Sequence, residues 1–210
     1  MQIDAGGRLC YLGRLWITAM ATFLVVAMTS FGAMANHTAH DPRLTRYSGG
    51  SAPPGFAGLC SRYAWACSNS GQGNVRAEKS MLSMARSVNA RFNRSIAPRT
   101  DQQTYGRSEY WTLPDRGVGD CEDYALAKQN ALIEQGVPPN RLYLATVVGS
   151  PQDPHTVLIM RTHSGDYVLD NLSARVKPWQ ATRYTFMKMQ NSRDRRRWDA
   201  VLLGPRALRK

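Results

Sequence analysis

One short segment constrains this chain more than any other: residues 117–124, Gly-Val-Gly-Asp-Cys-Glu-Asp-Tyr, lead directly into a run of helix-forming residues. From Tyr124 to Gln135 the chain contains no glycine or proline, and Gly136 is a typical C-terminal stop. The pattern predicts a helix that begins at Asp120 or Cys121. A cysteine in the first turn lies beside free backbone N–H groups and the positive end of the helix dipole, which favour a thiolate.

Burial is the simpler explanation of a lone cysteine, because free cysteine commonly behaves as a small apolar residue. The other two cysteines downstream of the N-terminal region are Cys60 and Cys67, and their close spacing predicts a disulfide in an oxidising compartment. No second pair of cysteine or histidine residues stands at matching spacing, which disfavours a zinc site. This pairing leaves Cys121 as the odd thiol, which suggests a reactive role.

The N-terminal region carries an export signal. In residues 1–35, two arginines are followed by a largely apolar run and then by Ala33-Met34-Ala35, the small-x-small form of a cleavage site. The apolar run is long enough that an uncleaved N-terminal anchor is the alternative. Residues 36–58 are rich in serine, glycine and proline, and they predict a linker or loosely held arm. Residues 59–210 then form one domain.

The chain is strongly basic, with a formal net charge of +12. A basic surface favours acidic partners, but net charge does not indicate the fold. Apart from a weak match at residues 193–198, no arginine-rich block is interleaved with aromatics that could stack on bases. Nucleic acid is therefore not an expected partner.

Helical and extended patterns together indicate the fold class. Residues 74–95 predict a helix with one apolar stripe, whereas Thr100–Tyr110 is polar and predicts a loop. The stripe consists of Met81, Ala85, Val88 and Phe92. Leu142–Val148 predicts a strand inside a sheet, because it is apolar on both faces. Two further strands are predicted at residues 155–161 and 167–171. A helix followed by antiparallel strands is typical of an α+β domain.

Three residues supply the groups that thiol hydrolysis requires. Cys121 lies at a helix start, His155 at a strand start and Asp170 late in the next strand. A symmetric turn at residues 164–165 would pair Asp170 with Ile159 and place Asp170 on the same sheet face as His155. The two would not be directly opposite. Contact then requires an off-centre turn, a bulge or a strongly twisted strand end.

Asp120, Glu122 and Asp123 flank the thiol, and nearby carboxylates disfavour a thiolate. Two explanations fit these acids. Asp120 can be the helix N-cap, with Asp123 in a capping-box-like arrangement. Alternatively, the acids hold a hard cation, for which Ca²⁺ is the natural candidate outside the cytoplasm.

These motifs resemble the bacterial transglutaminase-like cysteine proteinases, the family of the periplasmic LapG-like proteases. The resemblance rests on the Asp-Cys-Glu-Asp-Tyr segment, on His155-Thr-Val-Leu and on the Val-Leu-Asp-Asn segment at residues 168–171. It extends from about Ala52 to Trp198, and it includes Pro98-Arg-Thr-Asp and Lys177-Pro-Trp.

The resemblance implies a papain-like fold in its transglutaminase variant, with the nucleophile at the N-terminus of a helix packed on an antiparallel sheet. It implies Cys121 as nucleophile, His155 as base, Asp170 as orienting acid, and a Ca²⁺ site matching Asp120 and Glu122, with Asp123 a weaker member. It also implies a periplasmic enzyme that cleaves a large acidic surface adhesin to release cells from biofilm, and an inner-membrane cyclic di-GMP receptor as inhibitor. The competing hypotheses are a transglutaminase-type acyl transferase and a non-catalytic calcium-binding module of the same fold.

Overall fold

The structure is a computed structural model, and it describes residues 41–70, 73–74 and 77–205. The predicted export signal at residues 1–35 lies outside this part of the chain. Within the described part, no helix combines the length and the apolar character that crossing a membrane requires.

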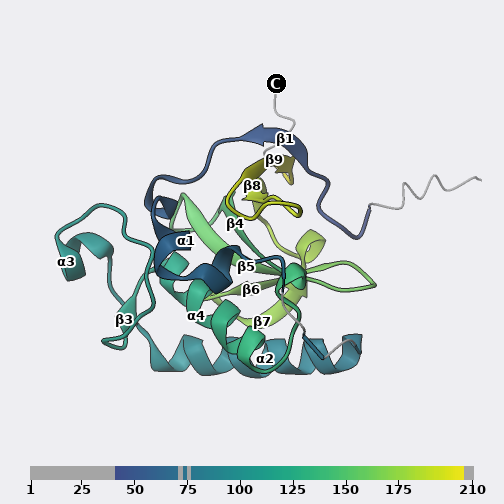
Figure 1. The fold of residues 1–210 in the computed structure, drawn as a ribbon, viewed down its shortest axis with the longest axis horizontal. Coiled ribbons are helices and arrows are strands. Elements are labelled where there is room, and N and C mark those ends of the chain that lie inside the picture. Colours follow the sequence, from purple (N-terminus) through teal and green to yellow (C-terminus); the bar gives the residue numbers. More distant parts are fainter. Residues whose placement is uncertain (1–40, 71–72, 75–76, 206–210) are drawn as a thin grey trace, which may run out of the picture. The chain divides into compact units, whose positions relative to one another are not determined.

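An antiparallel sheet of seven strands forms the centre of the fold, in the order β1-β9-β8-β4-β5-β6-β7 (Figure 1). Its strands are β1 (Tyr47–Gly50), β4 (Leu142–Val148), β5 (His155–Arg161), β6 (Asp166–Asp170), β7 (Ser173–Pro178), β8 (Thr185–Gln190) and β9 (Trp198–Leu203). Strands β4 and β5 are buried along almost their whole length. The prediction of an interior strand at 142–148 is confirmed, because β4 lies between β8 and β5.

Helices α2 (Glu78–Ser95) and α4 (Cys121–Glu134) pack against each other, α2 along β7 and α4 along β5 (Figure 1). The predicted α2 stripe is confirmed: Met81, Ala85 and Val88 are buried, and Phe92 is partly buried against the same core. Helix α4 begins and ends close to the predicted residues, and Gly136 takes the left-handed conformation, with φ of 88°, that favours glycine after a helix. The α+β prediction is confirmed.

A parallel two-stranded ladder, β2 (Ala97–Pro98) with β3 (Val118–Gly119), lies before α4 and pairs Pro98 with Gly119. The short helices are η1 (Pro54–Phe56), α1 (Leu59–Arg62), η2 (Ala64–Cys67), α3 (Asp101–Tyr105), η3 (Pro139–Arg141) and η4 (Trp179–Ala181). Helix α3 lies where a loop was predicted. The helix begins with a capping box. Thr100 Oγ1 accepts from the backbone amide of Gln103, and Gln103 Oε1 accepts from the backbone amide of Thr100.

The segment predicted as a linker, 36–58, is in part an element of the domain. Strand β1 pairs with β9, so it extends the sheet. Leu44 and Phe56 are buried, and the Phe56 ring packs edge-on against Trp111 and Trp198 at centroid distances of 5.8 and 5.3 Å. The buried side chains of Leu44 and Phe56 and the β1–β9 pairing therefore hold this segment to the domain, although its composition resembles that of a linker.

The predicted disulfide is confirmed, because Cys60 and Cys67 are bonded and hold α1 against η2. Replacing both cysteines by serine is expected to lower the free energy of unfolding by about 2 kcal/mol, since the bridge closes a short loop. Urea unfolding of the oxidised wild type and the double variant measures this. Equal midpoints, with equal denaturant dependence, would contradict a stabilising role for the bridge.

Candidate active site

Cys121 is the first residue of α4, and its sulfur lies between the helix start and the head of β5. The Thr156 amide donates to Sγ at 3.3 Å, and the thiol donates to Glu122 Oε2 at 3.2 Å. Cys121 is partly exposed and not in a disulfide. It opens onto a cleft of about 300 Å³, whose walls include Trp111, Val148 and Pro154. A polypeptide can therefore reach the thiol from solvent.

His155 and Asp170 are in direct contact. His155 Nε2 lies 2.9 Å from Asp170 Oδ1, and both residues are buried. The predicted register differs from the observed one by two residues, because Ile159 pairs with Val168 and not with Asp170. This off-centre turn brings Asp170 two residues closer to His155 along β5 on the shared face. It is one of the three ways in which contact was expected to arise.

Asp170 has two further hydrogen-bond partners. The Tyr184 hydroxyl donates to Oδ2 at 2.7 Å, and the Leu172 amide donates to Oδ1 at 2.9 Å. Burial raises the pKa of Asp170, but the hydrogen bonds from His155, Tyr184 and Leu172 outweigh it and hold the pKa below its ordinary value. The carboxylate therefore stays ionised beside the imidazole. Sequence reasoning missed Tyr184, because this residue precedes β8 and belongs to no recognised motif.

The second imidazole nitrogen of His155, Nδ1, is buried and has no hydrogen-bond partner among the described residues. Since Nε2 faces Asp170, Nδ1 is the ring atom left to exchange a proton with another group. No hydrogen bond joins Cys121 to His155 in the described part of the chain. The thiol is instead held by Thr156, the neighbour of His155 in sequence, and directs its proton to Glu122.

The electrostatic surroundings of the thiol oppose ionisation. Burial raises the pKa of Cys121 well above its ordinary value, and the charge of Glu122 raises it further. The Thr156 amide acts in the opposite direction but is too weak to reverse the effect. The concern that acidic neighbours disfavour a thiolate is therefore confirmed.

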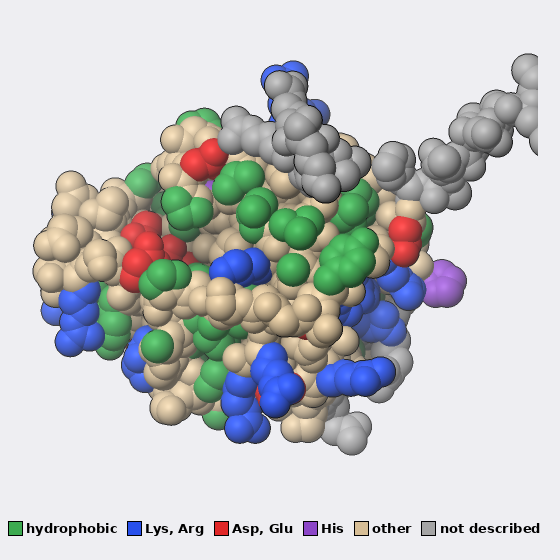
Figure 2. Space-filling view, turned by 90° about the horizontal axis from the view of Figure 1, so that it is seen from above, with side chains coloured by type: hydrophobic (Ala, Val, Ile, Leu, Met, Phe, Trp, Pro, Cys, Tyr) green, Lys and Arg blue, Asp and Glu red, His purple; other side chains and the backbone are tan. Residues whose placement is uncertain are grey.

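Three carboxylates converge beside the thiol. Asp101, Asp120 and Glu122 each offer an oxygen, and these oxygens lie within 4.8 Å of one another. The β2–β3 ladder explains how they meet. Because the two strands are parallel, the residues that follow them lie side by side. Asp101, after β2, therefore lies near Asp120, after β3. Figure 2 shows acidic side chains gathered on one face, towards the side on which α3 lies.

Of the three acids named from the sequence, Asp120 and Glu122 belong to this acidic group, whereas Asp123 lies outside it. Asp123 Oδ1 accepts from the Thr112 amide at 2.9 Å, which ties the loop before β3 to α4. A side chain at position 119 would clash with this carboxylate, since a Cβ there would lie 2.7 Å from Asp123 Oδ2. Asp101 takes the third place in the group. Its position in the Pro98-Arg-Thr-Asp segment was the sequence signal for it.

The capping explanation does not describe how Asp120 is used. Asp120 occupies the N-cap position, but its side chain makes no capping hydrogen bond. Its Oδ2 instead accepts from the Asp101 amide at 3.0 Å. The side chain therefore joins the acidic group and leaves the helix end to other partners.

The acidic group has the chemistry of a cation site. Oδ1 of Asp101 and Oδ1 of Asp120 are buried without a hydrogen-bond partner among the described residues. Burial is the main cause that raises the pKa of Glu122 well above its ordinary value, and the negative charge of Asp120 raises it further. Burial also raises the pKa of Asp101 to about 6, although the Tyr110 amide donates to it. Buried, unpartnered carboxylate oxygens are the ligands that Ca²⁺ prefers.

Comparisons with known proteins found one family model that matches most of this chain. The model of the family "bacterial transglutaminase-like cysteine proteinase" matches residues 46–204. Among curated proteins, no sequence matches the chain.

Three solved structures of LapG from Legionella pneumophila are similar to this chain. The calcium-bound form has 22% sequence identity and a TM-score of 0.49, and the match covers 63% of this chain and 78% of that one. The EGTA-treated form has 27% identity and a TM-score of 0.46, with 53% and 64% covered. A third LapG structure has 27% identity and a TM-score of 0.46, with 53% and 65% covered.

One buried cation in α4 has no role in the site chemistry described so far. Lys128 is almost fully buried, and its ammonium has no hydrogen-bond partner among the described residues. It lies 5.6 Å from the centre of the Tyr124 ring. Burial lowers the pKa of Lys128 to about 7, although the charge of Asp170 raises it. Such a group costs stability whenever it is protonated.

Replacing Lys128 by Met is therefore expected to raise the free energy of unfolding by roughly 1–3 kcal/mol at neutral pH. The pKa of Lys128 is about 7 in the folded state and near 10.5 when unfolded. The unfolded chain thus binds more protons between these values, and wild-type stability rises with pH across this window. In K128M this contribution disappears. Denaturation across the window measures both effects, and a less stable variant with an unchanged pH profile would contradict the assignment.

Proposed function

The chain belongs to the bacterial transglutaminase-like cysteine proteinase family, and we propose that it is a calcium-dependent endopeptidase acting through Cys121, His155 and Asp170. The observation that carries the proposal is the buried His155–Asp170 contact, together with the Thr156 amide, next to His155 in the chain, which donates to the sulfur of Cys121. A positioned imidazole with an ionised orienting carboxylate is the arrangement that activates a thiol.

In the proposed mechanism, Asp170 accepts from His155 Nε2–H and so presents Nδ1 as the basic atom. Nδ1 takes the proton of Cys121, and the thiolate attacks the peptide carbonyl. The imidazolium then returns the proton to the leaving amine, and water hydrolyses the acyl-enzyme. Tyr184 and the Leu172 amide keep Asp170 fixed and ionised. The backbone N–H of Cys121, at the helix start, is the proposed oxyanion donor.

Asp101, Asp120 and Glu122 are the residues that would hold Ca²⁺. The support is their convergence, together with one buried oxygen each of Asp101 and Asp120 that no described residue hydrogen-bonds. A bound divalent ion would offset the negative charge that raises the pKa of Cys121. Asp123 supports the site from outside by holding the Thr112 backbone.

We also propose that the enzyme is exported and cleaves an acidic cell-surface adhesin, under the control of an inner-membrane cyclic di-GMP receptor. The leader-like residues 1–35 support export. The basic composition of the chain supports an acidic substrate. The adhesin and the receptor are proposed from the resemblance to LapG-like proteases.

Replacing Cys121 by Ala is expected to lower hydrolysis of a susceptible protein at least about a thousandfold, because the nucleophile is lost. In the wild type with Ca²⁺ present, iodoacetamide should label Cys121 rapidly at neutral pH. His155→Ala should slow this labelling at least about tenfold, since the thiol loses its base. Mass mapping of the labelled protein measures the rates.

His163→Ala is the matched control, because His163 is exposed in the β5–β6 turn. Equal labelling rates in the His155 and His163 variants would contradict the assigned base. Incorporation of an added amine into the acyl product, in place of water, would assign the chain to acyl transfer.

Replacing Asp101 by Asn is expected to weaken Ca²⁺ binding at least about tenfold, because one charged ligand is removed. Calorimetric titration with Ca²⁺ alone measures this. Asp115→Asn, an exposed acid in the loop before β3, is the matched control and should bind normally. Asp123→Asn should lower stability more than affinity. Loss of binding in the Asp123 variant with normal binding in the Asp101 variant would restore the ligand set first predicted from sequence.

A further inference from the structure

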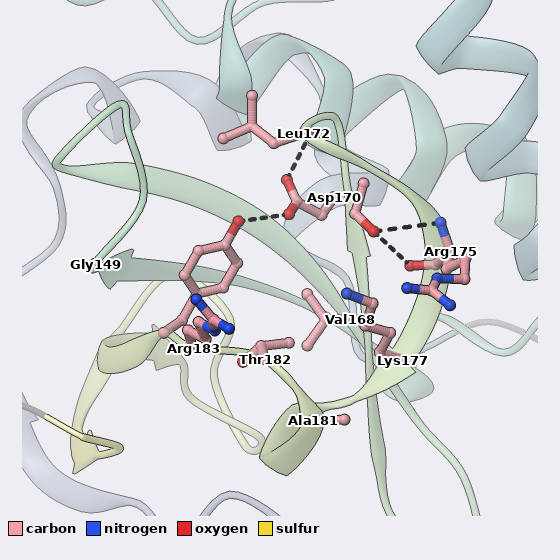
Figure 3. Close-up of a pocket in the computed structure, with 11 residues that line it drawn as sticks. Gly149, Val168, Asp170, Leu172, Arg175, Lys177, Ala181, Thr182 and Arg183 are labelled. Atoms are coloured by element: carbon pink, nitrogen blue, oxygen red, sulfur yellow. Dashed lines mark hydrogen bonds between the residues drawn. The ribbon is translucent and has the colours of Figure 1, made fainter.

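Another cavity, of about 420 Å³, opens beside β6 and β7, and Asp170 is among the residues that line it (Figure 3). Asp170 and Tyr184, which hold the imidazole, form part of its wall. Three cationic side chains surround it. Arg175 and Lys177 come from β7, and Arg183 comes from the segment after η4. We call this cavity the basic groove.

The positive charge of the basic groove is not neutralised within the described part of the chain. None of its three cations forms an ion pair there, whereas Arg161, Arg196 and Arg197 elsewhere on the domain do. The one acid in the lining is Asp170, and both of its oxygens are already occupied by His155, Tyr184 and Leu172. The groove therefore presents a net positive charge to a ligand.

Strand order offers another explanation for part of this charge. Strand β7 is the last in the sheet, and basic side chains on an edge strand discourage unwanted pairing with other chains. That explanation covers Arg175 and Lys177 but not Arg183, which lies outside the strands. In Figure 3, Arg183 approaches the cavity from the side opposite Arg175 and Lys177. Convergence from two elements indicates a site.

The basic groove lies beside the candidate triad. Asp170 lines the groove, and its Oδ1 contacts His155 Nε2 at 2.9 Å. Val148 lines the cleft that holds Cys121, and the next residue, Gly149, lines the groove. The groove is therefore placed to contact a substrate that is bound at the triad.

We propose that the basic groove binds an acidic segment of the protein substrate beside the scissile bond. Cleavage of that substrate rests on the proposed function, whereas binding of the acidic segment does not. A peptide fits better than a free phosphate, because the cations are spread around an open cavity and Leu172, 41% exposed, adds an apolar rim. Arg175 and Arg183 are exposed and Lys177 is half-exposed, as a transient substrate requires.

The test measures binding without catalysis. Fluorescein-labelled oligoglutamate is titrated into the purified Cys121→Ala protein, with oligoglutamine of equal length as the uncharged probe. In that background, Lys177→Glu with Arg183→Glu is expected to weaken oligoglutamate binding at least about tenfold. The matched control is Lys79→Glu with Arg86→Glu, which makes the same charge change at exposed positions of α2. It should change binding less than about twofold.

Equal losses in the two charge-reversed proteins would overturn the proposal, because net charge alone would then explain the binding. Equal affinity for oligoglutamine would overturn it as well. Displacement by inorganic phosphate at constant ionic strength would assign the groove to small anions. Tighter binding of an oligothymidylate, lost in the same variant, would assign it to nucleic acid. Oligoglutamate binding with no cleavage of any protein by the wild type would uphold the groove and refute the proposed function.

Discussion

The hydrogen bond between His155 and Asp170 is the contact on which the candidate site depends. It exists because β5 and β6 pair through an off-centre turn, so that two buried residues on the same sheet face come within 2.9 Å. Tyr184, contributed by the segment before β8, holds the other carboxylate oxygen. A shift of the hairpin by two residues would separate the acid from the imidazole while leaving every strand in place.

Charge is the second constraint. The fold concentrates carboxylates at the start of α4, where the helix dipole would otherwise favour a thiolate. Burial and Glu122 raise the pKa of Cys121, and Asp101 and Asp120 each keep a buried oxygen that has no hydrogen-bond partner within the described part of the chain. If the proposed calcium ion binds there, it would offset the carboxylate charge that opposes the nucleophile. That is the physical link between the proposed protease activity and the proposed calcium site.

The two cavities near the imidazole pair differ in their chemistry. The cleft at Cys121 has apolar walls that include Trp111 and Pro154, whereas the groove beyond Asp170 is lined by cations. Val148 lines the cleft, and the next residue, Gly149, lines the groove. In our proposal, the charge of the groove recognises the substrate, whereas the residues at the cleft carry out the chemistry.

Local patterns in the sequence determined the elements and the residue types of the site: α4 with Cys121 in its first turn, His155 opening β5, the Cys60–Cys67 pair and the α+β class. Their signals act over a few residues, through helix propensity, strand periodicity and cysteine spacing. Tertiary structure alone decided that Asp101 and not Asp123 joins Asp120 and Glu122, that Tyr184 supports Asp170, and that β1 completes the sheet. Each of these three contacts depends on how segments distant in sequence pair with one another, and local propensity carries no information on that pairing.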